Sequence, residues 1–496
     1  MSSNNNLGRF FRHSGIYAAG NALNRLGAFL LLPLYTRYLT TGHYGTLEMF
    51  YAISSIVSGI LAVGIAHATL RFYFEYKEQA DRNALVSTNL IAAAVISTAG
   101  ALLVAATGGR LVTWVLGSDA PPLALPIILV TLVLELSSQV CLAYLRAREL
   151  SVFFISVSFG KLIVQCIANT ILLAKFDAGV EGVLAGNLLA VAFGWLLLIG
   201  YTLRQCGLRL QRDKLAPVLR YSLPFLYTTI VAVLAGNIDR FMINSLLSLE
   251  ALGVYALALK FSKLISDLIG EPFNRSYGAF RFTMMGRPDA ATVQARIVRY
   301  VFALLSIVGL GLIYFTGDAL HLMSSPQFWP AADLMPLLVL ASIAQLLNYP
   351  AQTGILYNKS TRQLFHINLI QSTFGLAAGL LLMWQFGLQG ACLALLLSSV
   401  LGVALTHRIS QRYFPVQYEY RRLAILFAIL VAFYAVSIPL AWAPWTVALP
   451  CKIVLMLLFS WALLRSPAFD QREREWVGNR LGSLALLSAS RRSGKG

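Results

Sequence analysis

The 496-residue chain is 58% hydrophobic and only 12% charged, and its mean hydropathy is +0.69. A soluble domain has about 25% charged residues and could not bury so much apolar sequence, so these values predict an integral membrane protein. The net charge of +18 does not indicate a nucleic-acid partner. Most of the 39 Lys and Arg residues lie at the chain ends and in alternate connections between apolar segments, which is a topology signal.

The apolar segments predict an all-α protein with about fourteen transmembrane helices, each near the ~20 residues that cross a bilayer. Lys and Arg concentrate at the amino end, in the even-to-odd connections and in the carboxyl tail, so the positive-inside rule predicts that both termini are cytoplasmic. No connection is long enough for a soluble catalytic domain. The predicted spans are roughly 14–36, 44–70, 84–106, 122–145, 152–174, 180–203, 222–245, 252–274, 297–317, 331–356, 364–385, 388–407, 423–441 and 446–464.

The sequence contains none of the common motifs of catalysis or nucleotide binding. There is no Walker loop, dinucleotide fingerprint, zinc-protease motif or nucleophile elbow. The five cysteines are scattered without the spacing of a metal site. We therefore expect no enzymatic activity, no catalytic residues, no cofactor and no metal, and we do not expect this chain alone to hydrolyse ATP.

A shift of 208 residues aligns the chain with itself. Gly45 meets Gly253, the Phe-x-Phe pair at 72–74 meets that at 280–282, and Gly179, Gly182 and Gly194 meet Gly387, Gly390 and Gly402. Six helices are an even number, so both copies start on the same side of the membrane. The repeat predicts two parallel six-helix lobes, 1–205 and 206–411, around a central cavity. Two further helices at 412–465 and a basic cytoplasmic tail at 466–496 follow them.

Polar residues inside the first spans indicate which helices line that cavity. They occupy helices 1, 2, 5 and 7, and the copies related by the repeat have charge in equivalent places. Because neighbours on a helix point about 100° apart, we expect Asp239 and Arg240 to have different partners. The helix 5 cation is expected to line the cavity or to bridge to Glu135 in helix 4. These polar residues are Asn21, Asn24, Arg25, Glu48, Lys161, Asn237, Asp239 and Arg240.

Helix 8 has the densest charge of any predicted span. Lys260, Lys263, Asp267, Glu271 and Arg275 follow one another at intervals of three and four residues and share one face. An ionisable residue at the bilayer centre costs roughly 2.5–3.5 kcal/mol on insertion scales. This charged stripe must therefore face protein or water, which makes transport the first hypothesis.

Several of these residues also have a simpler structural explanation. Glu271 and Arg275, near the cytoplasmic end, would also fit an interfacial pair. Glu48 and Asp239 would also fit the neutralisation of nearby cations. We favour a functional role for the three deepest cations, which are Arg25, Lys260 and Lys263.

Several segments resemble a known family. The run Ser14–Gly45 is similar to the first helix and turn of bacterial lipid-linked oligosaccharide flippases of the Wzx type. These flippases belong to the multidrug, oligosaccharidyl-lipid and polysaccharide exporter superfamily. Three further segments share the resemblance, namely 70–73 (Leu-Arg-Phe-Tyr), 238–241 (Ile-Asp-Arg-Phe) and 252–256 (Leu-Gly-Val-Tyr-Ala).

The resemblance implies movement of a polyprenyl-pyrophosphate-linked glycan from the cytoplasmic to the periplasmic leaflet by alternating access. Arg25, Lys260 and Lys263 would then bind the pyrophosphate, and Asn21, Asn24 and Asn237 the sugar hydroxyls. Related lipid II flippases use Arg where helix 8 of this chain has lysines. The candidates for coupling to protons or sodium are Glu48, Asp239, Asp267 and Glu271.

The resemblance also implies a multi-pass protein of the bacterial inner membrane that works as a monomer among membrane lipids. A polysaccharide polymerase or glycosyltransferases are its expected partners. Two other classes stay open. One is a cation-coupled drug antiporter of the same superfamily, although the basic excess disfavours it. The other is a non-transporting component of a polysaccharide-secretion complex, whose contacts would have to use the tail after Arg465 or the 204–221 connection.

Overall fold

The computed structural model describes residues 27, 29–62, 64–117, 120–284, 286–471 and 473–475, and every regular element among them is a helix. The described residues fall into two compact units. Unit 1 comprises those of Met1–Ala256 and Met323–Phe328, and unit 2 comprises those of Leu257–Leu322 and Trp329–Gly496. Each unit is described by itself.

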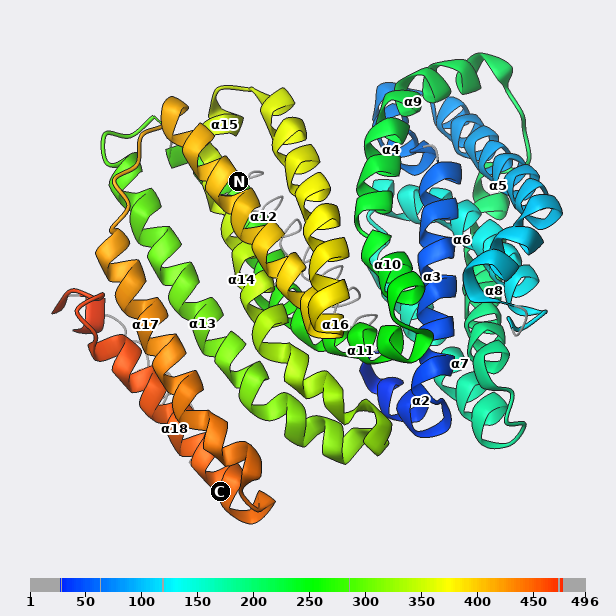
Figure 1. The fold of residues 1–496 in the computed structure, drawn as a ribbon. Helices are drawn as coiled ribbons and strands as arrows, with labels where there is room; N and C mark the ends of the chain where they lie inside the picture. Colours follow the sequence, from blue (N-terminus) through cyan, green and yellow to red (C-terminus); the bar gives the residue numbers. More distant parts are fainter. Residues whose placement is uncertain are drawn as a thin grey trace, which may run out of the picture. The chain divides into compact units, whose positions relative to one another are not determined.

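The core of unit 1 lies where α4 packs against three long helices. Leu85, Val140 and Tyr144 are fully buried there among apolar side chains of α4, α5, α6 and α8. The helices of this unit, coloured blue to green in Figure 1, are α2 (Leu32–Tyr38), α3 (Thr41–Leu61), α4 (Ile65–Glu75), α5 (Gln79–Leu116), α6 (Ala124–Ala147), α7 (Ser151–Ala174), α8 (Gly179–Cys206), α9 (Arg212–Ala235), α10 (Ile238–Leu246) and the start of α11 (Leu249–Ile265).

Unit 2 contains the remaining helices, except that Met323 of α13 and the first three residues of η2 belong to unit 1, and α16 is unusually long. Its 53 residues form two helices joined at Gly387, whose φ of +55° and ψ of −131° are not helical. Figure 1 shows the chain reversing there. The other elements are the π-helical turn η1 (Ser266–Gly270), α12 (Glu271–Met284), α13 (Ala290–Met323), η2 (Pro326–Leu334), α14 (Met335–Ala351), α15 (Thr353–Tyr357), α16 (Thr361–Tyr413), α17 (Tyr420–Ser437), η3 (Ile438–Trp442) and α18 (Trp445–Arg465).

The predicted spans beyond residue 36 all fall on helices. In the described chain ten helices are long and apolar enough to cross a membrane, and an eleventh span is the pair Arg212–Pro224 and Thr229–Leu246, bent by 43°. The helix from α11 to α12 is not among them because it has too many charges. The predicted span 44–70 is broken between α3 and α4 at Gly64, and most of the span 14–36 lies outside the described residues. The protein is a multi-pass all-α membrane protein.

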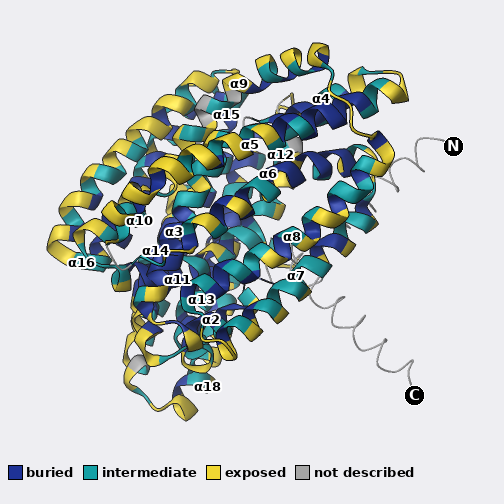
Figure 2. Cartoon of the chain, turned by 90° about the vertical axis from the view of Figure 1, so that its right-hand side faces the viewer, coloured by how far each residue is buried: buried dark blue, intermediate teal, exposed yellow. Residues whose placement is uncertain are grey.

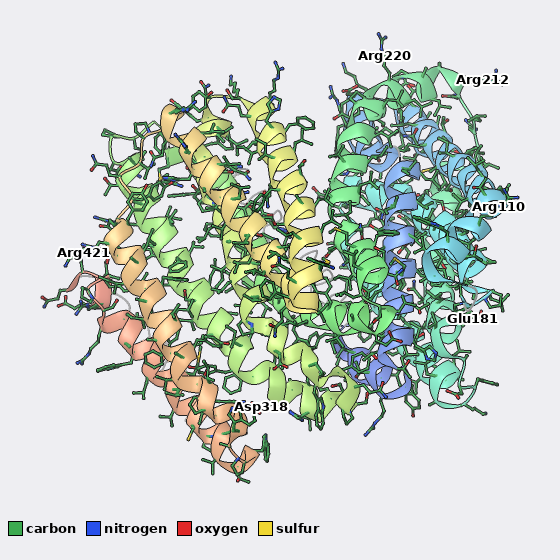
Figure 3. All side chains as sticks on the ribbon, viewed as in Figure 1. Arg110, Glu181, Arg212, Arg220, Asp318 and Arg421 are labelled. Atoms are coloured by element: carbon green, nitrogen blue, oxygen red, sulfur yellow. The ribbon has the colours of Figure 1, made fainter. Side chains whose placement is uncertain are left out.

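The two ends of unit 1 differ in chemistry. In Figure 3, Arg212 and Arg220 lie at one end of unit 1 and Glu181 lies toward the other. Three tryptophans that are 83–90% exposed, Trp114, Trp384 and Trp442, all lie in or beside connections predicted to be periplasmic. Exposed tryptophans are typical of the bilayer interface. The predicted orientation of the termini is consistent with this arrangement and stays a prediction.

Apolar side chains also cover outward-facing helix surfaces. Leu102, Leu103 and Leu196 are more than 60% exposed although they lie in the middle of apolar helices. Figure 2 shows such exposed positions in yellow on the outer faces of the helices, while buried positions in dark blue lie where helices pack together. A soluble protein rarely exposes so much apolar surface, so these faces are suited to lipid.

Within unit 2, a buried arginine connects the end of the described chain to α13. Arg299 of α13 is 1% exposed and forms ion pairs with Glu419, just before α17, and with Glu473, beyond α18. Tyr300 also donates a hydrogen bond to Glu473 and stacks on Phe469. The two predicted additional helices are thus held against α13 at one end by a network of charges.

If the 208-residue repeat is real, residues 208 positions apart should share backbone conformations. Two aligned glycines do. Gly179 joins α7 to α8 with a φ of +52°, and its counterpart Gly387 joins the halves of α16 with a φ of +55°. Both lie in the left-handed region that favours glycine. Each turn therefore reverses the chain into a helical hairpin, at positions 208 residues apart.

The repeat is also visible where α3 meets the start of α11. A Cβ built on Gly45 would lie 1.9 Å from the carbonyl oxygen of Leu249, and one on Gly253 would lie 2.0 Å from that of Thr41. Both glycines and both carbonyls are related by the shift of 208 residues. The contact is therefore reciprocal, as it is on a two-fold axis, and the two backbones touch because neither glycine has a side chain.

The packing units and the predicted lobes divide the chain at different places. Unit 1 extends to Ala256, because α9 and α10 pack against α3, α4 and α5. The lobes 1–205 and 206–411 are defined by the repeat, which a division by packing does not test. They stay a prediction, supported by the recurring glycines.

Candidate substrate and coupling site

The charged stripe of helix 8 lies on one continuous helix made of α11, η1 and α12. Lys260, Asp267 and Glu271 are half-buried, and Lys263 is exposed. All of them belong to unit 2. The surrounding apolar residues Leu257, Phe261 and Ile265 are almost fully buried. The helix therefore packs with its apolar side and leaves its charged side accessible.

The π-helical turn Ser266–Gly270 lies in the middle of this stripe and changes its geometry. In an α-helix each residue turns by about 100°, so residues four apart turn by about 400°, which is ~40° more than a full turn. From Lys263 to Arg275 the charged side chains would therefore shift around the helix by ~40° at each step. A π turn contains one extra residue, so the side chains after it are rotated back around the helix axis by about one residue, or ~100°. The turn thus narrows the stripe, and it places Asp267 where the helical hydrogen bonding is irregular. The sequence pattern did not predict this turn.

The end of the stripe that is predicted to be cytoplasmic forms an ordinary surface ion pair. Glu271 and Arg275 are 3.5 Å apart, with 43% and 59% of their side chains exposed. Arg71 and Glu75 at the end of α4 form a similar pair at 3.3 Å. Pairs of this kind contribute only about 0.3–0.5 kcal/mol. The interfacial role predicted as an alternative for Glu271 and Arg275 therefore fits their geometry.

On α10, two adjacent residues pair with each other. Nη1 of Arg240 lies 3.2 Å from Oδ1 of Asp239, which also accepts the backbone N–H of Arg240 at 3.0 Å. The prediction of separate partners for the two was wrong. It assumed regular helical geometry, whereas the chain breaks at Asn237 and Asp239 lies in the first turn of a new helix. There a carboxylate can accept an exposed backbone N–H, which brings it to the following side chain.

Asp239 also has a partner that the sequence did not reveal. The hydroxyl of Tyr255 in α11 donates a hydrogen bond to its Oδ2 over 2.9 Å. Asn237 donates to the carbonyl of Val233 at 2.7 Å and lies 3.4 Å from Oγ of Ser55 in α3. The start of α10 is thus held between α3 and α11 by polar contacts. That these helices line a common cavity stays a prediction.

Lys161 lies on α7 against α8. Its aliphatic carbons cover Gly194, and the two residues below it on the same face are hydrogen-bonded, Gln165 to Asn187 and Asn169 to Tyr35. Among the described residues Lys161 itself has no ion-pair partner, and the alternative bridge to Glu135 is not formed.

The remaining predicted site residues lie on the first two helices. Glu48 of α3 is 5% exposed, so it is too deep for a surface carboxylate. Asn21, Asn24 and Arg25 lie outside the described residues. Their roles stay predictions.

Comparisons with known proteins identify the family. A family model described as "Polysaccharide biosynthesis protein" matches residues 34–280, which include α3, α7, α10 and the charged stripe. The chain belongs to this family. The resemblance that the sequence motifs indicated is therefore confirmed. No curated protein matches the sequence significantly.

The fold of this chain is similar to those of solved transporters. It matches the lipid II flippase MurJ in an inward closed conformation with a TM-score of 0.67 and 13% identity over 90% of this chain and 97% of that one. It matches a mutant of the Vibrio cholerae MATE transporter VcmN with a TM-score of 0.51 and 15% identity, over 82% and 97%. An outward-facing MATE family transporter of the MOP superfamily gives 0.51 and 15%, over 82% and 95%. At these identities the likeness concerns the fold alone.

Two segments that separately resemble the Wzx family are connected in this structure. The hydrogen bond from Tyr255 to Asp239 joins the segment 252–256 to the segment 238–241. The reciprocal contact of Gly45 with Gly253 lies in the same region of unit 1. The 208-residue shift that aligns Gly45 with Gly253 was the sequence signal for the glycine contact. The hydrogen bond from Tyr255 to Asp239 had no such signal.

Proposed function

We propose that this protein translocates a polyprenyl-pyrophosphate-linked oligosaccharide from the cytoplasmic to the periplasmic leaflet, for the synthesis of a surface polysaccharide. The observation that carries the proposal is the charged stripe, with Lys260 and Lys263, on a helix that the family model covers. Support also comes from the fold, which a lipid II flippase shares.

The cations of the site have the chemistry that a pyrophosphate requires. Lys260 and Lys263 are separated by three residues, so both ammonium groups point to the same side of α11. With Arg25 they would neutralise the phosphates, and charge-assisted hydrogen bonds of this kind are about twice as strong as neutral ones. Lys161 and Arg240 add positive charge on α7 and α10.

Uncharged and acidic residues complete the proposed mechanism. Asn21, Asn24 and Asn237 supply amides for sugar hydroxyls. Glu48, Asp239, Asp267 and Glu271 are the candidates for binding a proton or sodium ion that resets the basic cavity. A carboxylate that exchanges a cation would shift the equilibrium between inward- and outward-open states of the two predicted lobes, 1–205 and 206–411. The π turn at Asp267 gives this residue a distinctive backbone setting.

The proposed setting is the bacterial inner membrane, with both termini cytoplasmic and the protein acting as a monomer. Its partners would be the lipid-linked glycan, membrane lipids and the polymerase or glycosyltransferases of the same pathway. The basic tail 466–496 would lie on the cytoplasmic side.

The decisive test measures the lipid-linked glycan that accumulates in the cytoplasmic leaflet of cells that depend on this protein. The Lys260→Gln/Lys263→Gln variant should accumulate it and stop surface polysaccharide synthesis. Arg275→Gln is the matched control, because it removes a positive charge from the same helix at an exposed ion pair. Wild-type translocation by the double variant, at equal protein levels, would refute the proposed anion site.

A second candidate function is cation-coupled export of a drug or another small molecule. The similarity in fold to MATE transporters favours it. The acidic candidates Asp239 and Asp267 would then be essential, while the lysines would not. Drug-efflux measurements on Asp267→Asn and on Lys260→Gln would distinguish the two functions.

A further inference from the structure

Unit 1 contains a polar cavity that is separate from the proposed transport site. Its volume is about 670 Å³, and its walls include Arg82, Asn83, Arg148, Glu149 and Gln205. These residues come from α5, from the end of α6 and from the end of α8. None of the proposed substrate or coupling residues contributes to it.

The cavity lies where four apolar spans end. Its residues include Tyr73 and Phe74 at the end of the span Thr41–Glu75, Arg82 near the start of Gln79–Arg110, Ala147 at the end of Ala124–Ala147 and Gln205 at the end of Gly179–Cys206. Ends of transmembrane spans lie at the headgroup layer of a bilayer. The cavity is therefore at the depth of lipid phosphates, on the side that the basic connections predict to be cytoplasmic.

Both arginines are positioned by neutral partners. Nε of Arg82 donates to the carbonyl of Tyr76 at 2.8 Å, and its guanidinium lies 5.2 Å from the centre of the Tyr73 ring. Nη1 of Arg148 donates to the hydroxyl of Tyr144 at 3.0 Å. Among the described residues neither arginine forms an ion pair. Since a guanidinium has five N–H donors, each keeps several for a further acceptor.

The wall of the cavity is also suited to the part of a lipid next to its phosphate. Phe74 is 65% exposed beside the buried Tyr73. Asn83 is held in place by donating to the carbonyl of Gln205 at 3.0 Å. The volume exceeds what one phosphate needs, so it has room for a glycerol headgroup as well.

We propose that this cavity binds the phosphate of an anionic phospholipid headgroup between Arg82 and Arg148. The phosphate oxygens accept hydrogen bonds from both guanidiniums, and the acyl chains lie along the apolar surface below Phe74. The site links the start of α5 and the end of α6 through one lipid. It is independent of the transported substrate.

The test measures thermal unfolding of the purified full-length protein in detergent against increasing dioctanoyl phosphatidylglycerol. Dioctanoyl phosphatidylcholine and soluble glycerol phosphate are the parallel ligands. We expect phosphatidylglycerol to raise the unfolding temperature most. The apparent affinity should fall about fivefold for each arginine replaced in Arg82→Gln and Arg148→Gln, since one cation near a membrane surface contributes about that factor.

The matched control is Arg287→Gln, which removes an exposed arginine paired with Asp289 in another part of the chain and should leave the affinity unchanged. The variant Arg82→Lys/Arg148→Lys should keep most of the binding, because it keeps the charge. If Arg82→Gln does not fold, Arg148→Gln, at an exposed helix end, still decides the question. Unchanged binding by Arg148→Gln would overturn the proposal. Equal or tighter binding of soluble glycerol phosphate would overturn the lipid as its source.

Discussion

The crossing of α3 and α11 offers a direct test of the two-fold relation within this chain. In Gly45→Ala the new methyl carbon would lie 1.9 Å from the Leu249 carbonyl oxygen. Carbon and carbonyl oxygen normally approach to about 3.3 Å, so the two helices must separate by about 1.4 Å. The atom in the way is backbone and cannot rotate aside. Overpacking of this kind costs about 1–3 kcal/mol.

Gly200→Ala in α8 is the matched control. It adds the same methyl group to a helix interior, where nothing lies within 4 Å of the new carbon. Alanine should stabilise that helix by about 0.5–1 kcal/mol relative to glycine. The same intrinsic gain applies at Gly45, so the difference between the two variants isolates the steric cost.

The two-fold relation adds a quantitative expectation. Gly253→Ala should cost as much as Gly45→Ala, because its methyl carbon would lie 2.0 Å from the Thr41 carbonyl oxygen. In the double variant the helices have already separated, so the combined loss should be smaller than the sum by about 0.5 kcal/mol or more. Thermal unfolding in detergent measures the wild type and the four variants. If Gly45→Ala is as stable as Gly200→Ala, or if the two losses add, the reasoning is refuted.

Three further predictions concern other contacts. Arg299→Gln should lower the free energy of unfolding by about 3–5 kcal/mol, because it leaves the carboxylates of Glu419 and Glu473 without their buried cation. Protease should then cleave the chain more readily after residue 465. Unchanged stability would contradict the network. Tyr255→Phe should cost about 1.5–3 kcal/mol through the lost hydrogen bond to Asp239, whereas Tyr357→Phe, at a 52% exposed tyrosine, should cost almost nothing. Burial raises the pKa of Tyr418 to about 12. In the unfolded chain its pKa is about 10, so the folded protein should lose stability as the pH rises from ~10 to ~12. In Tyr418→Phe the unfolding temperature should fall less steeply across this pH range. An unaltered pH profile would refute the assignment.

The family motifs and the charge pattern were sufficient to predict the class of this protein. Apolar spans about 20 residues long are imposed by bilayer thickness, so they are visible without tertiary information. The recurrence of glycines at 208 residues indicated the repeat, and the structure shows that two of them, Gly179 and Gly387, have the positive φ that strongly favours that residue. Lys260 and Lys263 stood out because charge is rare and costly inside a span.

Other features depended on the tertiary structure. The π turn at Asp267 leaves no mark in residue type, and the pairing of Asp239 with Arg240 requires a helix to restart at Ile238. The hydrogen bond from Tyr255 and the paired arginine site at Arg82 and Arg148 join residues far apart in sequence. Sequence determines which segments enter the membrane because hydrophobic transfer is a local property that adds along the chain. It does not determine which polar side chains meet, because that depends on where helices bend and how they pack.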